Sequence, residues 1–164
     1  GANVGRFQQG TKSQGTLNYH QIKNVVQALH EQGHKVMLCL NENHLKKLDD
    51  RTAATLREIK TMCLVCKTPT GLDDDLCWLY ASISLPRAFL VTMDELRNHI
   101  YTIDSAIQKW KQYRRITFEI NRVSGEVAFK YPLPYEVKPH LRKTGSGQTL
   151  WLPMEDTEWC SVEL

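Results

Sequence analysis

Apolar residues recur at helical spacing early in the chain and then give way to a short apolar run. Asn18 is a candidate N-cap for this helix, and Gly33 marks its C-terminal end. Residues 35–40 follow as a short apolar run, which predicts a buried strand. The buried face of the predicted helix is Ile22, Val25, Val26 and Leu29.

The same alternation of helix and strand continues to about residue 101. Residues 5–16 contain three glycines without apolar periodicity, and we predict a loop there. Helices are predicted over 51–62, 74–84 and 94–101, and buried strands over 63–66 and 88–92. Helices and strands that alternate at short spacing favour an α/β fold, with a parallel sheet flanked by helices on both faces.

The pattern changes after Trp110, where apolar and polar residues alternate with a period of two. Apolar residues at 116, 118 and 120 and at 127 and 129 flank Ser124-Gly125, which predicts a β-hairpin. Three prolines follow before another strand-like segment at 148–152. We therefore divide the chain into an α/β body, residues 1–109, and a C-terminal antiparallel β extension, residues 110–164.

Composition excludes several classes of protein. The chain has 164 residues, enough for about one domain, and no stretch approaches the ~20 consecutive apolar residues of a membrane helix. No membrane partner is therefore expected. The five cysteines are an odd number in core-like segments, which favours a reducing compartment over a disulfide framework. GxSxG, Walker and GxGxxG motifs are absent from the sequence.

Charge is distributed in blocks along the chain. Residues 73–108 carry two Lys/Arg against six Asp/Glu, whereas residues 1–72 carry ten against five and residues 109–143 carry nine against three. An acidic block between basic ones suggests a cation site flanked by surfaces suited to a polyanion. In the second basic block, Lys109, Lys111, Arg114 and Arg115 alternate with Trp110 and Tyr113. These residues either contact RNA phosphates or form an exposed helix end with Trp110 in the core.

Two acidic points lie at the same predicted edge of the sheet. Asp73, Asp74 and Asp75 directly precede a predicted helix, and Asp94 directly follows a predicted strand. The carboxyl end of a parallel sheet is where α/β proteins bind ligands. Converging carboxylates repel one another unless a cation compensates, and Mg²⁺ prefers such oxygens. Helix capping by the aspartates is the alternative reading, and the spacing leaves both open.

Several segments, in their order along the chain, resemble one known family. They are residues 1–5 (Gly-Ala-Asn-Val-Gly), 74–81 (Asp-Asp-Leu-Cys-Trp-Leu-Tyr-Ala) and 91–99 (Val-Thr-Met-Asp-Glu-Leu-Arg-Asn-His), followed by Tyr-Pro-Leu-Pro-Tyr at 131–135 and Trp-Leu-Pro at 151–153. Together they resemble the motifs of proteinaceous RNase P, in particular its NYN metallonuclease domain of PIN-like fold. The resemblance covers nearly the whole chain.

The resemblance implies a metal-dependent endoribonuclease. Such an enzyme removes the 5′ leader of precursor tRNA by hydrolysing a phosphodiester bond, and leaves a 5′-phosphate on the tRNA. The implied partners are precursor tRNA and an N-terminal helical-repeat region that lies outside this sequence. Both an organelle such as the mitochondrion and the nucleus fit the family.

The resemblance also assigns residues to the site. Asp74, Asp75 and Asp94 match the positions that bind catalytic Mg²⁺ or Mn²⁺, and Asp73 is a further candidate ligand. Asn3 is expected to shape the site, and His99 matches a histidine near the metals. A helical histidine such as His99 is otherwise a packing or hydrogen-bonding group. Lys111, Arg114 and Arg115 are the candidate RNA-binding residues.

The sequence departs from the family pattern at two places. The family motif begins with an aspartate immediately before Gly1, so we expect the chain as given to lack one metal ligand and the strand that carries it. The family also holds a structural Zn²⁺ through an upstream cysteine pair, a histidine and a C-terminal cysteine. Cys160 matches that last cysteine, but Leu152 stands where the histidine is expected. We predict no zinc site formed by this chain alone.

Cys63 and Cys66 do not replace the upstream cysteine pair in this interpretation. Residues three apart on a strand point to opposite faces, and we expect both to be buried thiols. Two alternatives to a tRNA-processing enzyme stay open. One is a PIN-like RNase that acts on another RNA, and the other is a catalytically silent RNA-binding module of the same fold.

Overall fold

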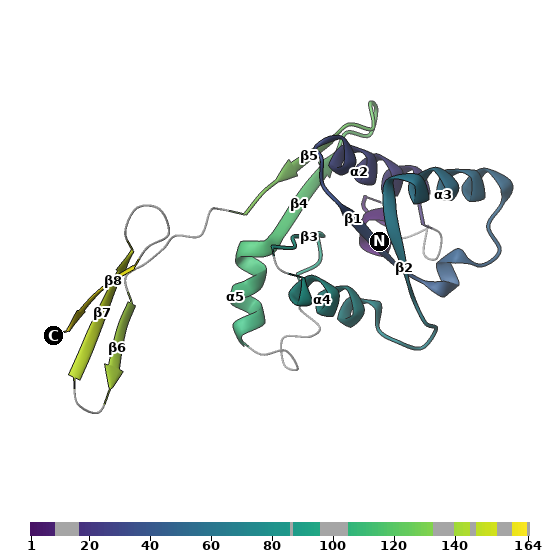
Figure 1. Ribbon diagram of the computed structural model, residues 1–164. Coiled ribbons are helices and arrows are strands. Elements are labelled where there is room, and N and C mark those ends of the chain that lie inside the picture. The colour runs from purple at the N-terminus through teal and green to yellow at the C-terminus, as the bar shows by residue number, and fades with distance from the viewer. Residues whose placement is uncertain are drawn as a thin grey trace. The chain divides into compact units, whose positions relative to one another are not determined.

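The structure is a computed structural model (Figure 1). It describes residues 1–8, 17–85, 87–95, 105–132, 140–144, 147–153 and 159–163. Helices alternate with strands in the first part, and both β1·β2 and β3·β4 are parallel pairs, so the predicted α/β class is confirmed. The elements are α1 (Ala2–Gly5), α2 (Tyr19–Glu31), β1 (Val36–Asn41), the 3₁₀ helix η2 (Glu42–Leu45), α3 (Asp50–Met62), β2 (Cys63–Thr68), α4 (Asp74–Ser84), β3 (Leu90–Val91), α5 (Ser105–Arg114), β4 (Arg115–Ile120), β5 (Val127–Lys130), β6 (His140–Thr144), β7 (Gly147–Pro153) and β8 (Trp159–Glu163).

Helix α2 has the caps and the buried face that its sequence predicts. The Asn18 side chain accepts hydrogen bonds from the main-chain N–H groups of His20 and Gln21. Gly33 follows the helix with a φ of +82°, a conformation that glycine adopts without steric cost. The predicted buried residues Ile22, Val25, Val26 and Leu29 are all buried. They join one core cluster with residues of β1, α3 and β4, including Leu40, Ile59 and Phe118.

Strands β1 and β2 form a two-stranded parallel sheet connected through α3. Their register runs from Val36 opposite Cys63 to Asn41 opposite Thr68. The strand predicted at 63–66 is confirmed, but its predicted burial is wrong, because these four residues alternate between half-buried and exposed positions. Cys63 is half-buried and Cys66 is exposed, so the expectation of two buried thiols is wrong for Cys66. Among the described strands β2 pairs only with β1, and an edge strand keeps part of its surface in water.

A second sheet has the order β3-β4-β5. β3 runs parallel to β4, and β4 and β5 form the predicted antiparallel hairpin, with Ile120 opposite Val127. Gly125 turns the chain with a φ of +74°. Because β4 pairs with β3, the hairpin belongs to the first compact unit, which extends from Gly1 to Pro132. The compact unit therefore ends later than the division between residues 109 and 110 that the pattern suggested.

Residues 133–164 form the second compact unit. Its described part is an antiparallel sheet in the order β6-β7-β8, and the strand predicted at 148–152 is confirmed within β7. In the first unit, Asp94 and Glu95 are not helical, and the rest of the helix predicted over 94–101 lies outside the described residues. No helix in the described ranges is both long and apolar enough to cross a membrane.

Candidate metal centre

The three consecutive aspartates lie at the start of α4. Asp73 is the N-cap, and its carboxylate accepts a hydrogen bond of 2.9 Å from the main-chain N–H of Asp75. Asp74 and Asp75 occupy the first turn, where the helix dipole favours negative charge. Each aspartate offers one carboxylate oxygen, and these three oxygens lie within 4.8 Å of one another. Asp73 therefore caps the helix, and the carboxylates also converge.

Asp75 is held in place by a neighbour on its own helix. The indole Nε1–H of Trp78 donates to Oδ1 of Asp75 at 3.0 Å. Burial is the main cause that raises the pKa of Asp75, and the charges of Asp94, Asp74 and Asp73 raise it further, while the Trp78 hydrogen bond lowers it. The charge of Asp94 thus acts on Asp75, but among the described residues only the oxygens of Asp73, Asp74 and Asp75 lie within 4.8 Å of one another. A bound cation would favour the ionised form of Asp75.

Asp94 lies in a turn after β3 that we call the Asp94 turn (residues 93–95). The main-chain N–H of Met93 donates to Oδ1 of Asn3 at 2.8 Å, and the N–H of Asp94 donates to Oγ1 of Thr92 at 3.1 Å. The carbonyl groups of the turn also accept hydrogen bonds, and the guanidinium of Arg115 donates to the carbonyl of Asp94 at 3.2 Å. Lys111 Nζ donates to the carbonyl of Glu95 at 2.6 Å. Asn3 thus holds the main chain of this turn at Met93.

The basic residues predicted to bind RNA differ in their surroundings. Lys111 and Arg115 contact the Asp94 turn, whereas the guanidinium of Arg114 lies 5.5 Å from the ring centre of Phe89. All three are half-buried. Trp110 is half-buried too, so it is not part of the fully buried core. Lys111 and Arg114 lie in the last turn of α5.

Sequence reasoning missed a histidine near the acidic edge. His44 lies on η2 and is half-buried. Its pKa is lowered, mainly by burial and also by the charge of Arg6, and the charge of Asp74 opposes this shift only in part. The Tyr19 hydroxyl donates a hydrogen bond to the His44 carbonyl. No motif in the sequence singles out His44 among the six histidines. His99, which the resemblance placed near the metals, lies outside the described residues.

The donor set at the acidic edge suits a hard divalent cation. Carboxylate oxygens are the ligands that Mg²⁺ and Mn²⁺ prefer over nitrogen and sulfur. Converging carboxylates, one of them with a pKa raised by burial and like charge, are in an environment that a cation would stabilise. By its chemistry, the group of converging oxygens from Asp73, Asp74 and Asp75 therefore suits such an ion, and the charge of Asp94 acts on the same group.

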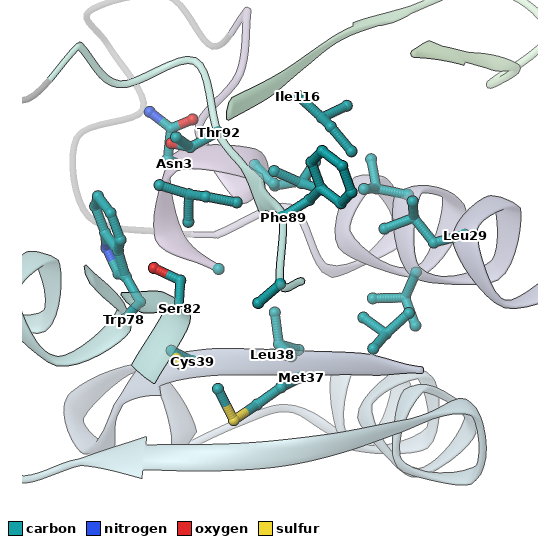
Figure 2. Close-up of a pocket in the computed structure, with 18 of the residues that line it drawn as sticks. Asn3, Leu29, Met37, Leu38, Cys39, Trp78, Ser82, Phe89, Thr92 and Ile116 are labelled. Atoms are coloured by element: carbon teal, nitrogen blue, oxygen red, sulfur yellow. The ribbon is translucent and has the colours of Figure 1, made fainter. Parts of the chain in front are cut away.

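A cavity of about 540 Å³ lies beside this edge (Figure 2). One wall is formed by β1, including Met37 and Leu38, and the other by the segment around β3, including Phe89. Figure 2 shows Asn3 and Thr92 close together beside the cavity. Among the described strands, β1 pairs only with β2 and β3 pairs only with β4, so each has an unpaired edge.

Gly1 also lines this cavity. A Cβ at this position would collide with the carbonyl oxygen of Cys39, so the backbone approach requires glycine. Gly1 is thus packed closely against β1.

The donor set implied for zinc does not fit the C-terminal sheet. Leu152 lies directly opposite Cys160 in the antiparallel pair β7·β8. A leucine side chain has no atom that binds a metal, so this position supplies one thiol and no second ligand. Cys160 is exposed. The described residues of this sheet therefore do not make a closed four-ligand zinc site of the structural type.

Comparison with known proteins places this arrangement in a family. The model of the family "Protein-only RNase P" matches residues 1–163. Proteinaceous RNase P 2 of Arabidopsis thaliana is 31% identical over 153 residues, which cover 89% of this chain and 28% of that protein. Proteinaceous RNase P 3 of the same plant is 29% identical over 153 residues, which cover 89% of this chain and 26% of that protein.

A solved structure agrees with these sequence matches. The crystal structure of nuclear proteinaceous RNase P 2 from A. thaliana superimposes with a TM-score of 0.70 at 27% identity, over 97% of this chain and 35% of that one. The chain thus spans about a quarter to a third of the length of these relatives. Since the family model covers nearly every residue, the chain belongs to the protein-only RNase P family.

Proposed function

We propose that this chain is the nuclease domain of an endoribonuclease that removes the 5′ leader of precursor tRNA with Mg²⁺ or Mn²⁺. The observation that carries the proposal is the convergence of the Asp73, Asp74 and Asp75 carboxylates at the start of α4, on which the charge of Asp94 also acts from outside that helix. Membership of the protein-only RNase P family supports tRNA as the substrate class. A capping role alone explains Asp73, but it does not explain why the charge of Asp94 acts on Asp75 from outside the helix.

In this proposal Asp74, Asp75 and Asp94 hold the divalent cation. When bound, such a cation activates water at neutral pH and stabilises the charge that develops on the leaving oxygen of a phosphodiester. Trp78 fixes the orientation of the Asp75 carboxylate and opposes the rise in its pKa that burial causes. Asn3 fixes the Asp94 turn. Asp73 contributes the N-cap of α4 and additional negative charge.

Arg114 is the candidate for phosphate contact in the basic segment. A guanidinium that stacks on an aromatic ring still presents its planar edge to phosphate oxygens. Arg115 and Lys111, the other two predicted RNA-binding residues, donate hydrogen bonds to the protein's own main chain. We therefore place the main phosphate contact of this segment at Arg114.

Cleavage of a labelled RNA tests the proposed function. The full-length protein that contains this chain is incubated with a 5′-labelled precursor tRNA in Mg²⁺, with EDTA and Asp75→Asn as negative controls. Asp50→Asn is the matched variant, because it removes an exposed carboxylate from the first turn of α3. One cut at the mature 5′ end, lost with EDTA and Asp75→Asn and kept in Asp50→Asn, is expected.

The other outcomes separate the alternatives. Metal-dependent cuts elsewhere in the RNA would keep the nuclease and overturn the assignment to 5′ leaders. Binding of tRNA with no cut under any metal condition would instead favour a silent RNA-binding module. Cleavage that survives Asp75→Asn would overturn the assigned metal centre.

A further inference from the structure

Among the contacts of the described residues, four hydrogen bonds involve the main chain of the Asp94 turn. The N–H groups of Met93 and Asp94 donate to Asn3 and Thr92, and the carbonyls of Asp94 and Glu95 accept from Arg115 and Lys111. Their lengths run from 2.6 Å for Lys111 to 3.2 Å for Arg115. Three consecutive residues are thus bonded to α1, to Thr92 just after β3, to α5 and to β4.

We infer that Arg115 and Lys111 are positioning residues, which hold the Asp94 carboxylate in register with Asp74 and Asp75. Each donates from a charged group to a main-chain carbonyl, and hydrogen bonds from charged donors are the stronger kind. The two carbonyls belong to consecutive residues, so the pair restrains both the position and the direction of the turn. This inference rests on the proposed function, since it concerns the same metal centre.

The geometry separates this role from RNA binding. Arg114 and Arg115 are neighbours in sequence and carry the same charge, but only Arg115 donates a hydrogen bond to the Asp94 turn in the described contacts. The chain therefore supplies a matched pair for mutagenesis. Replacing either residue with alanine removes one positive charge from the same segment, and only one replacement releases the turn.

Removing the charge of Arg115 and removing its contact with the Asp94 turn should change the affinity for a cation in opposite directions. A positive side chain near a cation site repels the cation, so by charge alone its removal should tighten cation binding. If Arg115 instead positions Asp94, its removal misplaces a ligand and weakens binding. Residues that orient metal ligands typically change metal affinity by about 10- to 100-fold when they are removed. The sign of the change therefore identifies the role.

Titration of the full-length protein with Mn²⁺ alone, followed by electron paramagnetic resonance, measures this sign without any RNA. Arg115→Ala is expected to weaken Mn²⁺ binding by about tenfold, whereas Arg114→Ala leaves it unchanged or slightly tighter. Arg115→Lys, which keeps a charged donor, is expected to recover part of the loss. Circular dichroism verifies that each variant is folded. Lys111→Met is a second, independent variant, because it keeps most of the side chain and loses the donor.

Cleavage kinetics supply a second readout. Arg115→Ala is expected to raise the Mg²⁺ concentration for half-maximal cleavage and to lower kcat, with little change in KM for the RNA. Arg114→Ala is expected to raise KM and to flatten its salt dependence, as loss of a phosphate contact does. If both variants raise KM alike and neither changes the Mg²⁺ requirement, both are RNA contacts and the inference is overturned.

The two proposals fail in different ways. Tighter or unchanged Mn²⁺ binding in folded Arg115→Ala and Lys111→Met would overturn the positioning role while leaving the nuclease in place. Weaker Mn²⁺ binding in these variants, in a protein that cuts no precursor tRNA, would retain the positioning role and overturn the substrate. A wild-type protein that neither binds Mn²⁺ nor cuts RNA would overturn both.

Discussion

The two acidic points of the candidate metal centre are held in different ways. In the α4 cluster, Asp73 bonds to the N–H of a residue two positions away, and Asp75 accepts from a residue three positions away. In the Asp94 turn, the N–H of Asp94 bonds locally to Thr92, but the partners of the Met93 N–H, the Asp94 carbonyl and the Glu95 carbonyl lie 90, 21 and 16 residues away. One half of the site is thus a local helix start, and the other half depends on the tertiary fold.

This difference has a consequence for mutation. The α4 cluster should keep its internal geometry as long as its own helix forms, because its hydrogen bonds span one turn. The Asp94 turn should shift whenever any of its distant partners is lost, even if the rest of the fold is intact. Substitutions on α1, α5 and β4 that remove these partners should therefore displace a metal ligand, even though they leave every carboxylate in place.

The largest effect is expected when a carboxylate itself is lost from either half. Asp75→Asn and Asp94→Asn should each lower cleavage of precursor tRNA by at least about 100-fold, because several kcal/mol of transition-state stabilisation depend on the bound cation. Single-turnover cleavage at saturating Mg²⁺ measures the loss. Near-normal cleavage by either variant would show that the corresponding half is not part of the metal centre.

Although Asp75→Asn should lower cleavage, it should raise the stability of the metal-free protein at neutral pH. Because the pKa of Asp75 is raised above its usual 3.8, the folded state holds this proton more tightly than the unfolded chain. The stability that the proton contributes is present below pH 3.8 and is lost as the pH rises through the raised folded pKa. With EDTA at pH 7, the asparagine variant should therefore melt slightly higher than the wild type, with no gain below pH 3.8. An equal or lower midpoint at pH 7 would contradict this prediction.

The next effect tests the distant support of the Asp94 turn from α1. Asn3→Ala removes the acceptor for the Met93 N–H, and it should raise the Mg²⁺ concentration for half-maximal cleavage by about tenfold. Asn24→Ala is the matched control, since Asn24 also makes a long-range hydrogen bond, from its amide to the carbonyl of Gly125. Equal Mg²⁺ requirements in the two variants would contradict the prediction that the Asp94 turn depends on its distant hydrogen-bond partner on α1.

The same distinction explains how much could be predicted from sequence. The caps at Asn18 and Asp73 and the hairpin around Gly125 were accessible, because each depends on a few neighbouring residues. The positions of Asp73 at the start of α4 and of Asp94 shortly after β3 were expected from the order of the elements along the chain. The contacts of Lys111 and Arg115 were not, since a lysine or arginine that bonds a distant carbonyl has no sequence pattern of its own.

The exposure of β2 was missed for a related reason. The strand at β2 contains enough apolar residues to suggest burial, but exposure depends on whether another strand or helix covers it, and this is not a local property. The division at residue 110 followed a change of periodicity, whereas β4 joins the first unit by pairing with β3. Periodicity indicates the type of an element and not its partner.

A smaller effect separates capping from metal binding at Asp73. Asp73→Ala removes the N-cap of α4 and should cost about 1 kcal/mol of unfolding free energy, or about 2–4 °C in a domain of this size. Asp73→Ser retains an acceptor for the Asp75 N–H and should recover most of that loss. If Asp73 only caps, both variants should require the same Mg²⁺ concentration. A higher Mg²⁺ requirement in Asp73→Ser, with stability restored, would show that this carboxylate also contributes to the metal centre.

The smallest effect is expected outside both halves, in the C-terminal sheet. If metal dependence belongs to the acidic edge alone, Cys160→Ser should leave the thermal midpoint unchanged by EDTA or added Zn²⁺, as in the wild-type chain. The reason is local, because the residue directly opposite Cys160 is Leu152, which cannot bind a metal. Elemental analysis of the purified chain checks this result independently. Stoichiometric zinc that is lost in Cys160→Ser would show that the sheet holds a second metal, with ligands that the described cross-strand pair does not supply.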